Sequence, residues 1–369
     1  QGHRVLLLDR AGMPSDTMST HAMLRTGVLQ LTRWGLIDRV VAAGTPAVRR
    51  IVLGFGGDRV PFELTDDYGI DALYAPRRVV LDDILIRAAV EAGVEFHDGT
   101  AVKDLVHDRD GTVVGVVAGR TGDPTSHTAT MVVGADGVWS RVARLVDADE
   151  YRSHPPVNAI HYAYFTGVDV TGFWFQFTPG INAGIIPTND GEACVFVGRP
   201  PGRLDDFRAD PEGEFHRLLA EAGADLAAVV GAGTRRGGFR GTPGLPGFLR
   251  QASGPGWALV GDAGYTKDPI SAHGMSDALR DAELCARAID GALRAPDRTA
   301  QAMAGYQVLR DHLSLPVYRE SKALAGYDWG ATEASDRMRR ISAAVRAECA
   351  AIVSLPEWTA VHPDLAWAG

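Results

Sequence analysis

The chain has 369 residues, 46% of them hydrophobic and 22% charged, which is the composition of an ordinary soluble globular protein with room for two lobes. Its formal net charge of −9 argues against nucleic acid or an anionic membrane as a partner, because both attract clustered lysine and arginine. No apolar run reaches the roughly 20 residues of a membrane span. The cysteines are far apart and fit no metal spacing, so we expect a reducing, cytoplasmic location: Cys194, Cys285 and Cys349.

The first part of the chain has the pattern of an α/β protein. Gln1-Gly2-His3 is typical of the end of a helix, so we expect a segment upstream of it. Val5–Leu8, closed by Asp9, is a short apolar run of the kind found in a parallel strand buried on both faces. The elements expected next are a helix carrying Leu24, Val28 and Leu31, an antiparallel excursion at 49–74, a helix at 81–93, and strands at 94–96, 112–118 and 131–133.

The pattern changes at about residue 151. The stretches NAIHYAYFTGVDV (158–170) and GFWFQFTPG (172–180) are aromatic and alternating, which is typical of antiparallel sheet. Residues 205–224 favour helix, and the residue pattern of an α/β protein then returns around residue 257. The stretch RMRRISAAVRAECAAIV (337–353) predicts one amphipathic helix, which can pack on its own core or on a second chain in a homodimer.

The order of these segments predicts an α/β fold in which a mostly antiparallel sheet interrupts a dinucleotide-binding domain, with a helical tail at the C-terminus. The predicted boundaries are 1–48, 75–150 and 245–325 for the discontinuous α/β domain, 49–74 and 151–244 for the sheet domain, and 326–369 for the tail.

Two acidic turns in the first α/β part are candidate cofactor contacts. Asp9 ends a strand, where an acid can accept hydrogen bonds from ribose hydroxyls, although a strand-terminal aspartate is more often a turn residue. In VVGADGVWSRVAR (132–144), Asp136-Gly137 makes a turn whose backbone N–H groups favour an anion. An ordinary turn with Ser140 as helix cap explains this second segment equally well.

The segment WALVGDAGYTKDPISAHGM (257–275) combines three features of a binding site. Gly261-Asp262 leaves a buried strand, so the acid can accept hydrogen bonds from a polyol chain. Asp268-Pro269 makes a turn, and His273-Gly274-Met275 begins a helix with exposed backbone donors, which stabilise partial negative charge on a bound ring.

Taken together, these motifs resemble those of the group A flavoprotein monooxygenases of the p-hydroxybenzoate hydroxylase type, over about residues 3–325. The resemblance implies a Rossmann-like FAD-binding domain with an inserted substrate domain. The N-terminal glycine fingerprint of that family is not in this sequence. The FAD contacts that the resemblance implies are Asp9, Arg25, Arg78, Asp136, Gly137, Gly261, Asp262, Pro269, Gly274 and Met275.

In that family, NADPH or NADH reduces FAD, dioxygen adds to the flavin, and the hydroperoxide transfers one oxygen to an electron-rich ring. The resemblance thus implies a monooxygenase for a small aromatic or polyketide-like molecule of secondary metabolism. No metal is needed for this chemistry, and the 11 histidines show no close ligand pairing.

The catalytic candidates are two histidines. His273 stands beside the proposed flavin, and His161 could assist phenol deprotonation, because imidazole titrates near neutrality. Alternation divides the aromatic strands into two faces, and the sequence does not say which face lines a pocket. The candidate pocket residues are Tyr162, Tyr164, Trp174 and Gln176.

Three other functions share this scaffold. A flavin-dependent halogenase normally shows a WxWxIP motif, which WFQFTPG (174–180) does not fit, and Lys267 is in the wrong segment for the halogenase lysine. A flavin-dependent reductase of isoprenoid double bonds is a second alternative, and a flavin-binding protein without turnover is a third.

Overall fold

A computed structural model describes residues 2–120 and 123–357 of the chain. Its strands are β1 (Leu6–Leu8), β2 (Arg50–Phe55), β3 (Asp58–Glu63), β4 (Glu95–His97), β5 (Ala101–His107), β6 (Val113–Arg120), β7 (Asp123–Thr128), β8 (Val132–Gly134), β9 (Glu150–His154), β10 (Ala159–Thr166), β11 (Phe173–Thr178), β12 (Ile181–Pro187), β13 (Glu192–Arg199), β14 (Thr234–Thr242), β15 (Gly247–Arg250), β16 (Ser253–Gly254), β17 (Trp257–Leu259) and β18 (Tyr265–Thr266).

The α-helices are α1 (Arg25–Arg33), α2 (Ile37–Ala42), α3 (Arg78–Glu91), α4 (Arg141–Leu145), α5 (Leu204–Ala209), α6 (Pro211–Ala222), α7 (Ala224–Gly231), α8 (Gly274–Arg294), α9 (Thr299–Ala325) and α10 (Ala331–Ser354). These elements confirm the predicted α/β fold with an inserted antiparallel sheet and a C-terminal helix.

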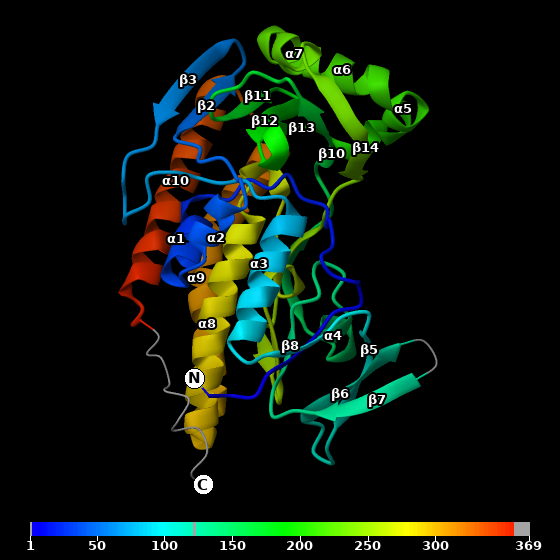
Figure 1. Cartoon of the computed structure of the whole chain (residues 1–369), viewed down its shortest axis with the longest axis vertical. Helices are drawn as coiled ribbons and strands as arrows, with labels where there is room; N and C mark the ends of the chain where they lie inside the picture. The colour runs from blue at the N-terminus through cyan, green and yellow to red at the C-terminus, as the bar shows by residue number, and fades with distance from the viewer. Residues whose placement is uncertain (1, 121–122, 358–369) are drawn as a thin grey trace.

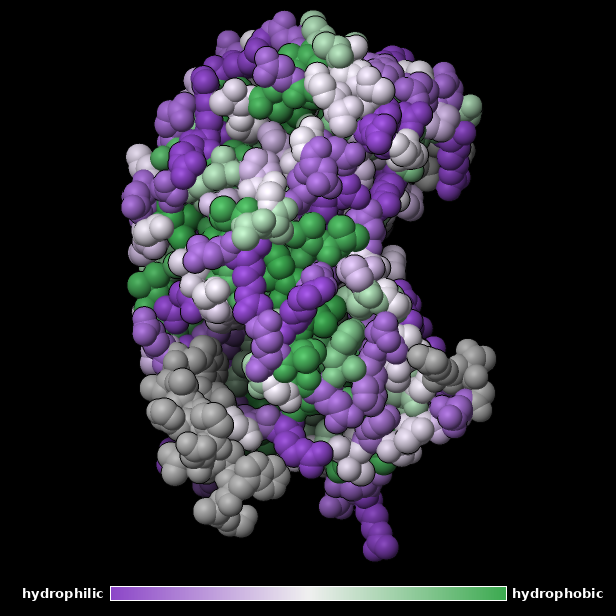
Figure 2. All heavy atoms as spheres, in the orientation of Figure 1, coloured by the Kyte–Doolittle hydropathy of each residue, from purple (hydrophilic) through white to green (hydrophobic). Residues whose placement is uncertain are grey.

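The molecule is elongated, with the large sheet at one end (Figure 1). Helices α5–α7 cover the outer side of that sheet, and α8, α9 and α10 run side by side along the body. The small sheet β5–β6–β7 projects at the opposite end. Figure 2 shows apolar surface in the middle of one face, between the large sheet and this projection.

The large sheet has seven strands in the order β14-β10-β13-β12-β11-β2-β3. All its pairs are antiparallel except β11–β2, which is parallel and joins the early excursion to the later strands. The alternating aromatics of β10 and β11 therefore form buried strands, because each face of the sheet packs on a separate apolar cluster.

The two sides of this sheet bury different material. One side packs on α1, α10 and the core of the α/β part through Tyr162, Tyr164 and Phe175. The other side packs on α6 and α7, where Phe215 and Leu219 are fully buried. Asp210 begins α6 by accepting a hydrogen bond from the backbone N–H of Gly213, and Pro211 occupies the first turn.

The α/β part contains two short parallel pairs, β1–β4 and β8–β17. The prediction that the first strand is buried on both faces is wrong, because Leu7 of β1 is 37% exposed and Val5 is 49% exposed. Only Leu6 and Leu8 of β1 turn toward the interior, so the short apolar run has one covered face.

Helix α10 packs against α1 and α9 of its own chain, as the first of the two alternatives for the amphipathic tail expects. Its apolar face is buried in the main core through Ala334, Ile341, Val345, Cys349 and Ile352. In the described part of the chain, every helix is too short or too polar to cross a bilayer.

Candidate flavin site at the ends of β8 and β17

The two acidic motifs follow neighbouring parallel strands. Leu259 of β17 stands opposite Gly134 of β8, and the Val260 N–H donates to the Gly134 carbonyl at 3.0 Å. The turns that carry Asp136 and Asp262 therefore leave the same edge of one sheet. Dinucleotides bind outside the carboxyl ends of parallel strands in such sheets, so the two motifs have the placement that a shared cofactor requires.

Asp136 organises its own turn. Its carboxylate accepts hydrogen bonds from the N–H groups of Arg141 at 2.6 Å and Val142 at 3.1 Å, and from the Ser140 hydroxyl. Gly137 has a φ of 78°, which glycine adopts without strain. The acid caps the first turn of α4 and leaves the backbone at Gly137 to face a ligand.

Asp262 has a different environment. Within residues 2–120 and 123–357, no hydrogen bond reaches its carboxylate. Burial raises the pKa of the Asp262 carboxyl, although the positive charges of Lys267 and Arg78 act in the opposite direction. The preceding Gly261 has a φ of 54°, and a Cβ there would come within 3.2 Å of Ala278 on α8. A half-buried acceptor without an internal partner fits the ribityl hydroxyls of a flavin.

The N-terminus of α8 offers the second part of a flavin cradle. A Cβ placed on Gly274 would meet nothing within 4 Å, so open space lies in front of the first helical N–H groups. Pro269 begins a short 3₁₀ turn, and Ala272 has a left-handed φ of 51° before the helix starts. Met275 is half-buried, and its Sδ lies 3.9 Å from the Ser19 hydroxyl.

Three of the FAD contacts that the resemblance implies, Arg78, Arg25 and Asp9, differ in their surroundings. Arg78 starts α3, binds Asp82 through two hydrogen bonds of 2.8 and 3.0 Å, and lies close enough to Asp262 to affect its pKa. Arg25 instead donates to three backbone carbonyls between residues 65 and 70, which closes that loop. Asp9 accepts from the Ala11 N–H at 2.8 Å and thus holds its own turn. The structure groups Arg78 with Asp262 and gives Arg25 a backbone role.

His273 does not line an open site, which corrects its prediction as a catalytic side chain. Its imidazole is fully buried, and Nε2 lies 2.7 Å from Oε2 of Glu348 on α10. Burial lowers the pKa of His273 in spite of the facing carboxylate. His273, Asp277 and Glu348 have the spacing of a metal triad, but Lys267 and Arg280 already neutralise these carboxylates.

The structure also corrects the prediction of His161 as a catalytic base for phenol deprotonation. Its ring stacks on Phe207 with the centroids 3.7 Å apart, on the side of the large sheet that α5–α7 cover. Burial lowers the pKa of His161 to about 4. The imidazole therefore packs between layers, away from the α8 end of the sheet.

The four predicted pocket residues lie on opposite faces of the sheet. Across the register, Tyr162 aligns with Phe196, Gly184 and Phe175, so Phe175 shares the face of the tyrosines. Gln176 and Trp174 point to the other face, where the Gln176 amide donates to the Gly56 carbonyl at 2.9 Å. The prediction that all four line one pocket is therefore wrong, because neighbouring positions on a strand alternate between faces.

A histidine that sequence reasoning missed faces these tyrosines. The His21 Nε2 lies 2.5 Å from the Tyr164 hydroxyl, and the Ser19 N–H donates to the Tyr162 hydroxyl at 3.2 Å. His21 is 1% exposed with a φ of 68°, an unusual backbone conformation for a histidine. The one sequence signal for this contact was the polar run Ser19-Thr20-His21, which stands just before an apolar helix.

The His21–Tyr164 pair is electrically neutral near pH 7. Burial lowers the pKa of His21 to about 3, helped by the charge of Arg77, and burial raises the pKa of Tyr164. The Arg77 guanidinium lies 3.8 Å above the Tyr164 ring, and Asp16 binds both Arg77 and Arg240. The pair therefore places neutral hydrogen-bonding groups beside an apolar aromatic surface.

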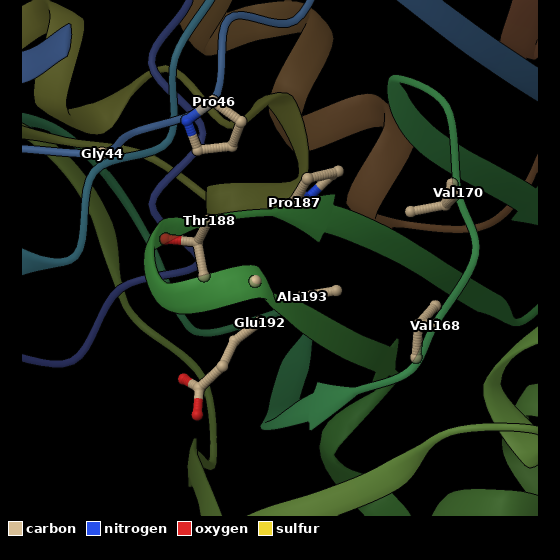
Figure 3. Close-up of a pocket in the computed structure, with 9 residues that line it drawn as sticks. Gly44, Pro46, Val168, Val170, Pro187, Thr188, Glu192 and Ala193 are labelled. Atoms are coloured by element: carbon tan, nitrogen blue, oxygen red, sulfur yellow. The ribbon is translucent and has the colours of Figure 1, made fainter.

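A shallow groove of about 220 Å³ lies at the far end of the sheet, between the β12–β13 turn and the loops at residues 44–46 and 168–170 (Figure 3). Pro46, Pro187 and Val170 line it, and Glu192 is its only charged group. Glu192 is already paired with Arg77 at 2.9 Å. The groove lacks the donor and acceptor set that the α8 end of the sheet provides.

Residues 1–229 match the family model described as FAD binding domain. This chain belongs to that family. It is therefore an FAD-binding flavoprotein oxidoreductase.

Several curated relatives of this flavoprotein are reductases. It is 28% identical to the digeranylgeranylglycerophospholipid reductase of Methanocella arvoryzae over 270 residues, which are 68% of this chain and 64% of that protein. It is 25% identical to the menaquinone reductase of Mycolicibacterium smegmatis over 307 residues, covering 77% of this chain and 70% of that protein. The chain spans only 64%, 60% and 54% of the three methanogen reductases that it matches first.

Solved structures similar to this flavoprotein include monooxygenases and halogenases. Pseudomonas aeruginosa PqsL in complex with 2-aminobenzoylacetate aligns with a TM-score of 0.77 and 24% identity, covering 93% of each chain. The myxobacterial halogenase CndH aligns with a TM-score of 0.78 and 21% identity, covering 93% of this chain and 84% of CndH. At sequence identities of 24% and 21%, the similarity to these structures establishes the fold alone.

Proposed function

We propose that this flavoprotein is a monooxygenase that takes electrons from NADPH or NADH and inserts one oxygen atom of dioxygen into a small aromatic or polyketide-like molecule. The second oxygen atom leaves as water, with the electron pair and one proton coming from the nicotinamide and a second proton coming from solvent. Bound FAD supplies the electron transfer and the activation of dioxygen. The likeness to PqsL and the neutral His21–Tyr164 pair on an aromatic sheet face support the proposal.

The chain's own residues have defined tasks in this proposal. Asp262 accepts hydrogen bonds from the ribityl chain, and the N–H groups at Gly274 and Met275 stabilise negative charge on the flavin ring. The face of Tyr162, Tyr164 and Phe175 provides an apolar boundary that excludes water. The neutral His21 and Tyr164 side chains orient the polar group of the substrate through hydrogen bonds.

The observation that carries the proposal is the His21–Tyr164 contact of 2.5 Å on the face of the sheet that looks toward the flavin domain. A neutral imidazole paired with a phenol suits an aromatic substrate whose hydroxyl or amino group must be oriented. We place the substrate against Tyr162, Tyr164 and Phe175, and no longer against Trp174 or Gln176.

Reduction of a lipid or quinone is a second candidate, and the curated relatives favour it because several are reductases. The decisive experiment offers the purified protein NADPH or NADH, dioxygen and a panel of phenols and quinones. Oxygen uptake with a product that gains one oxygen supports the monooxygenase. A product that gains two hydrogens, or a halogen when halide is added, overturns it.

The proposed flavin placement has its own test in Asp262→Ala. We expect the dissociation constant for FAD to rise by about tenfold to a hundredfold, the value of one or two hydrogen bonds to a charged group. The fold should persist, because Asp262 makes no hydrogen bond within residues 2–120 and 123–357. Asp297→Ala, at an exposed aspartate, is the matched control and should bind FAD normally. Equal flavin content in both variants would refute the placement, and a colourless protein that refuses added FAD would refute the enzyme.

A further inference from the structure

The loop between Asp268 and His273 joins the Gly-Asp motif to the start of α8. It contains a 3₁₀ turn and the left-handed Ala272, a conformation that persists only where its surroundings hold it. The His273 end of this loop is bound directly to a residue that follows α9, and the Asp268 end is linked to another through Asn158. Both residues that follow α9 lie outside the 1–229 span matched by the family model.

The His273 end is bound by α10. Glu348 and His273 are both fully buried, with Oε2 and Nε2 2.7 Å apart. Thr26 of α1 donates to the same Glu348 oxygen at 3.3 Å, and Arg280 lies 3.3 Å from the other oxygen. Burial opposes ionisation of Glu348, but the facing His273 and Arg280 outweigh it and lower its pKa. An ionised carboxylate of α10 thus holds the residue that immediately precedes Gly274.

The Asp268 end is linked to the α9–α10 connection through Asn158. Asp268 accepts hydrogen bonds from the Asn158 amide at 3.1 Å and from the Ile270 N–H at 3.0 Å. The Tyr327 hydroxyl donates to the other side of the Asn158 amide at 2.8 Å. It also contacts Asn182 on β12, so the chain of bonds runs from the loop through Asn158, which precedes β10, to the C-terminal segment.

We propose that the segment from Tyr327 to Glu348 is a clamp that sets the conformation of the 268–273 loop and thereby the affinity and optical properties of the bound flavin. The proposal rests on the placement of the flavin at the start of α8 under the proposed function. Glu348 and Tyr327 are positioning residues, since they act on the flavin through His273 and Asn158.

The charge of Glu348 argues for a role beyond packing. A buried ion pair contributes little net stability compared with well-packed apolar residues of the same volume. The α10 interface already has an apolar stripe that secures the helix, with Ile341, Val345 and Ile352 buried. The carboxylate adds a directional bond to one imidazole, which restricts where the loop and the first N–H groups of α8 can lie.

Two variants test the clamp. Glu348→Gln keeps the shape and an acceptor for His273 while it removes the charge, and Tyr327→Phe removes only a hydroxyl. Glu320→Gln is the control, because Glu320 of α9 pairs with Arg337 and Arg340 of α10 and so ties the same two helices together at the surface. Each full-length protein is prepared without FAD, checked by circular dichroism, and titrated with FAD.

The measurements are the FAD dissociation constant, the visible spectrum of the bound flavin, and the melting temperature of the FAD-free protein. We expect both clamp variants to bind FAD about tenfold more weakly, which corresponds to about 1.4 kcal/mol of binding free energy. The visible spectrum of the bound flavin should also shift. Glu320→Gln should stay within about twofold of the unmodified chain.

Unchanged FAD affinity and spectrum in the clamp variants would overturn the inference, even if their melting temperatures fall, because that pattern means a merely structural role. If Glu348→Gln does not fold, the Tyr327→Phe result decides. Failure of the unmodified chain to take up FAD would instead overturn the flavin placement, so the two failures are distinguishable.

Discussion

Asp268 provides a test of the electrostatics at the flavin loop that needs no ligand. Its side chain is fully buried, Oδ1 accepts from Asn158 and Ile270, and within the described residues Oδ2 has no partner. Burial raises the pKa of Asp268 from 3.8 to about 7. The folded protein therefore keeps the proton on Asp268 over a range of pH in which the unfolded chain has lost it.

The sign follows from proton linkage. Above pH 3.8 the unfolded chain releases the Asp268 proton while the folded chain retains it up to about pH 7, so the stability contributed by this group falls through that window. The difference of about 3 pH units corresponds to about 4 kcal/mol in total. About 2 of those units lie above pH 5, so stability should fall by about 3 kcal/mol between pH 5 and pH 8 on account of Asp268.

Asp268→Asn removes this dependence, because an amide preserves the Oδ1 acceptor and does not ionise. We expect the free energy of unfolding of the variant, relative to the unmodified chain, to be about 3 kcal/mol higher at pH 8 than at pH 5. Urea denaturation at the two pH values measures this difference. Asp297→Asn, at an exposed aspartate, is the control and should show no pH-dependent difference. Equal relative stability of Asp268→Asn at pH 5 and pH 8 would refute the reasoning.

Two further predictions concern packing, and urea denaturation checks both. Gly256→Ala should destabilise the protein by more than about 2 kcal/mol, because Gly256 has a φ of 77° and a Cβ would overlap the Val113 carbonyl. Gly57→Ala is the control: open space surrounds this glycine, so the substitution should change stability by less than about 0.5 kcal/mol. Phe215→Ala should cost about 3–5 kcal/mol, because this ring is fully buried between the sheet and α6, yet it should leave FAD binding unchanged because it lies on the face of the sheet away from α8. A mild effect of the first, or a large loss of FAD affinity in the second, would contradict the described packing.

The local sequence determined the elements of this protein well. The alternating aromatics at 158–166 and 172–178 formed the strands β10 and β11, and the run at 337–353 formed the amphipathic α10. The Gly-Asp motif at 261–262 ended a buried strand and led into a helix, as its residue pattern requires. These features depend on side-chain period, glycine conformation and helix starts, which are properties of neighbours in the chain.

Only the tertiary structure decided which side chains meet. Alternation divides β10 and β11 into two faces, but the registers through β12 and β13 decide that Tyr162 shares a face with Phe175. His21 reaches Tyr164 across 143 positions, and His273 turns inward because Glu348 lies 75 positions away on α10. Such contacts depend on how the layers of the fold pack together, and no local sequence pattern determines which residues far apart in the chain will meet.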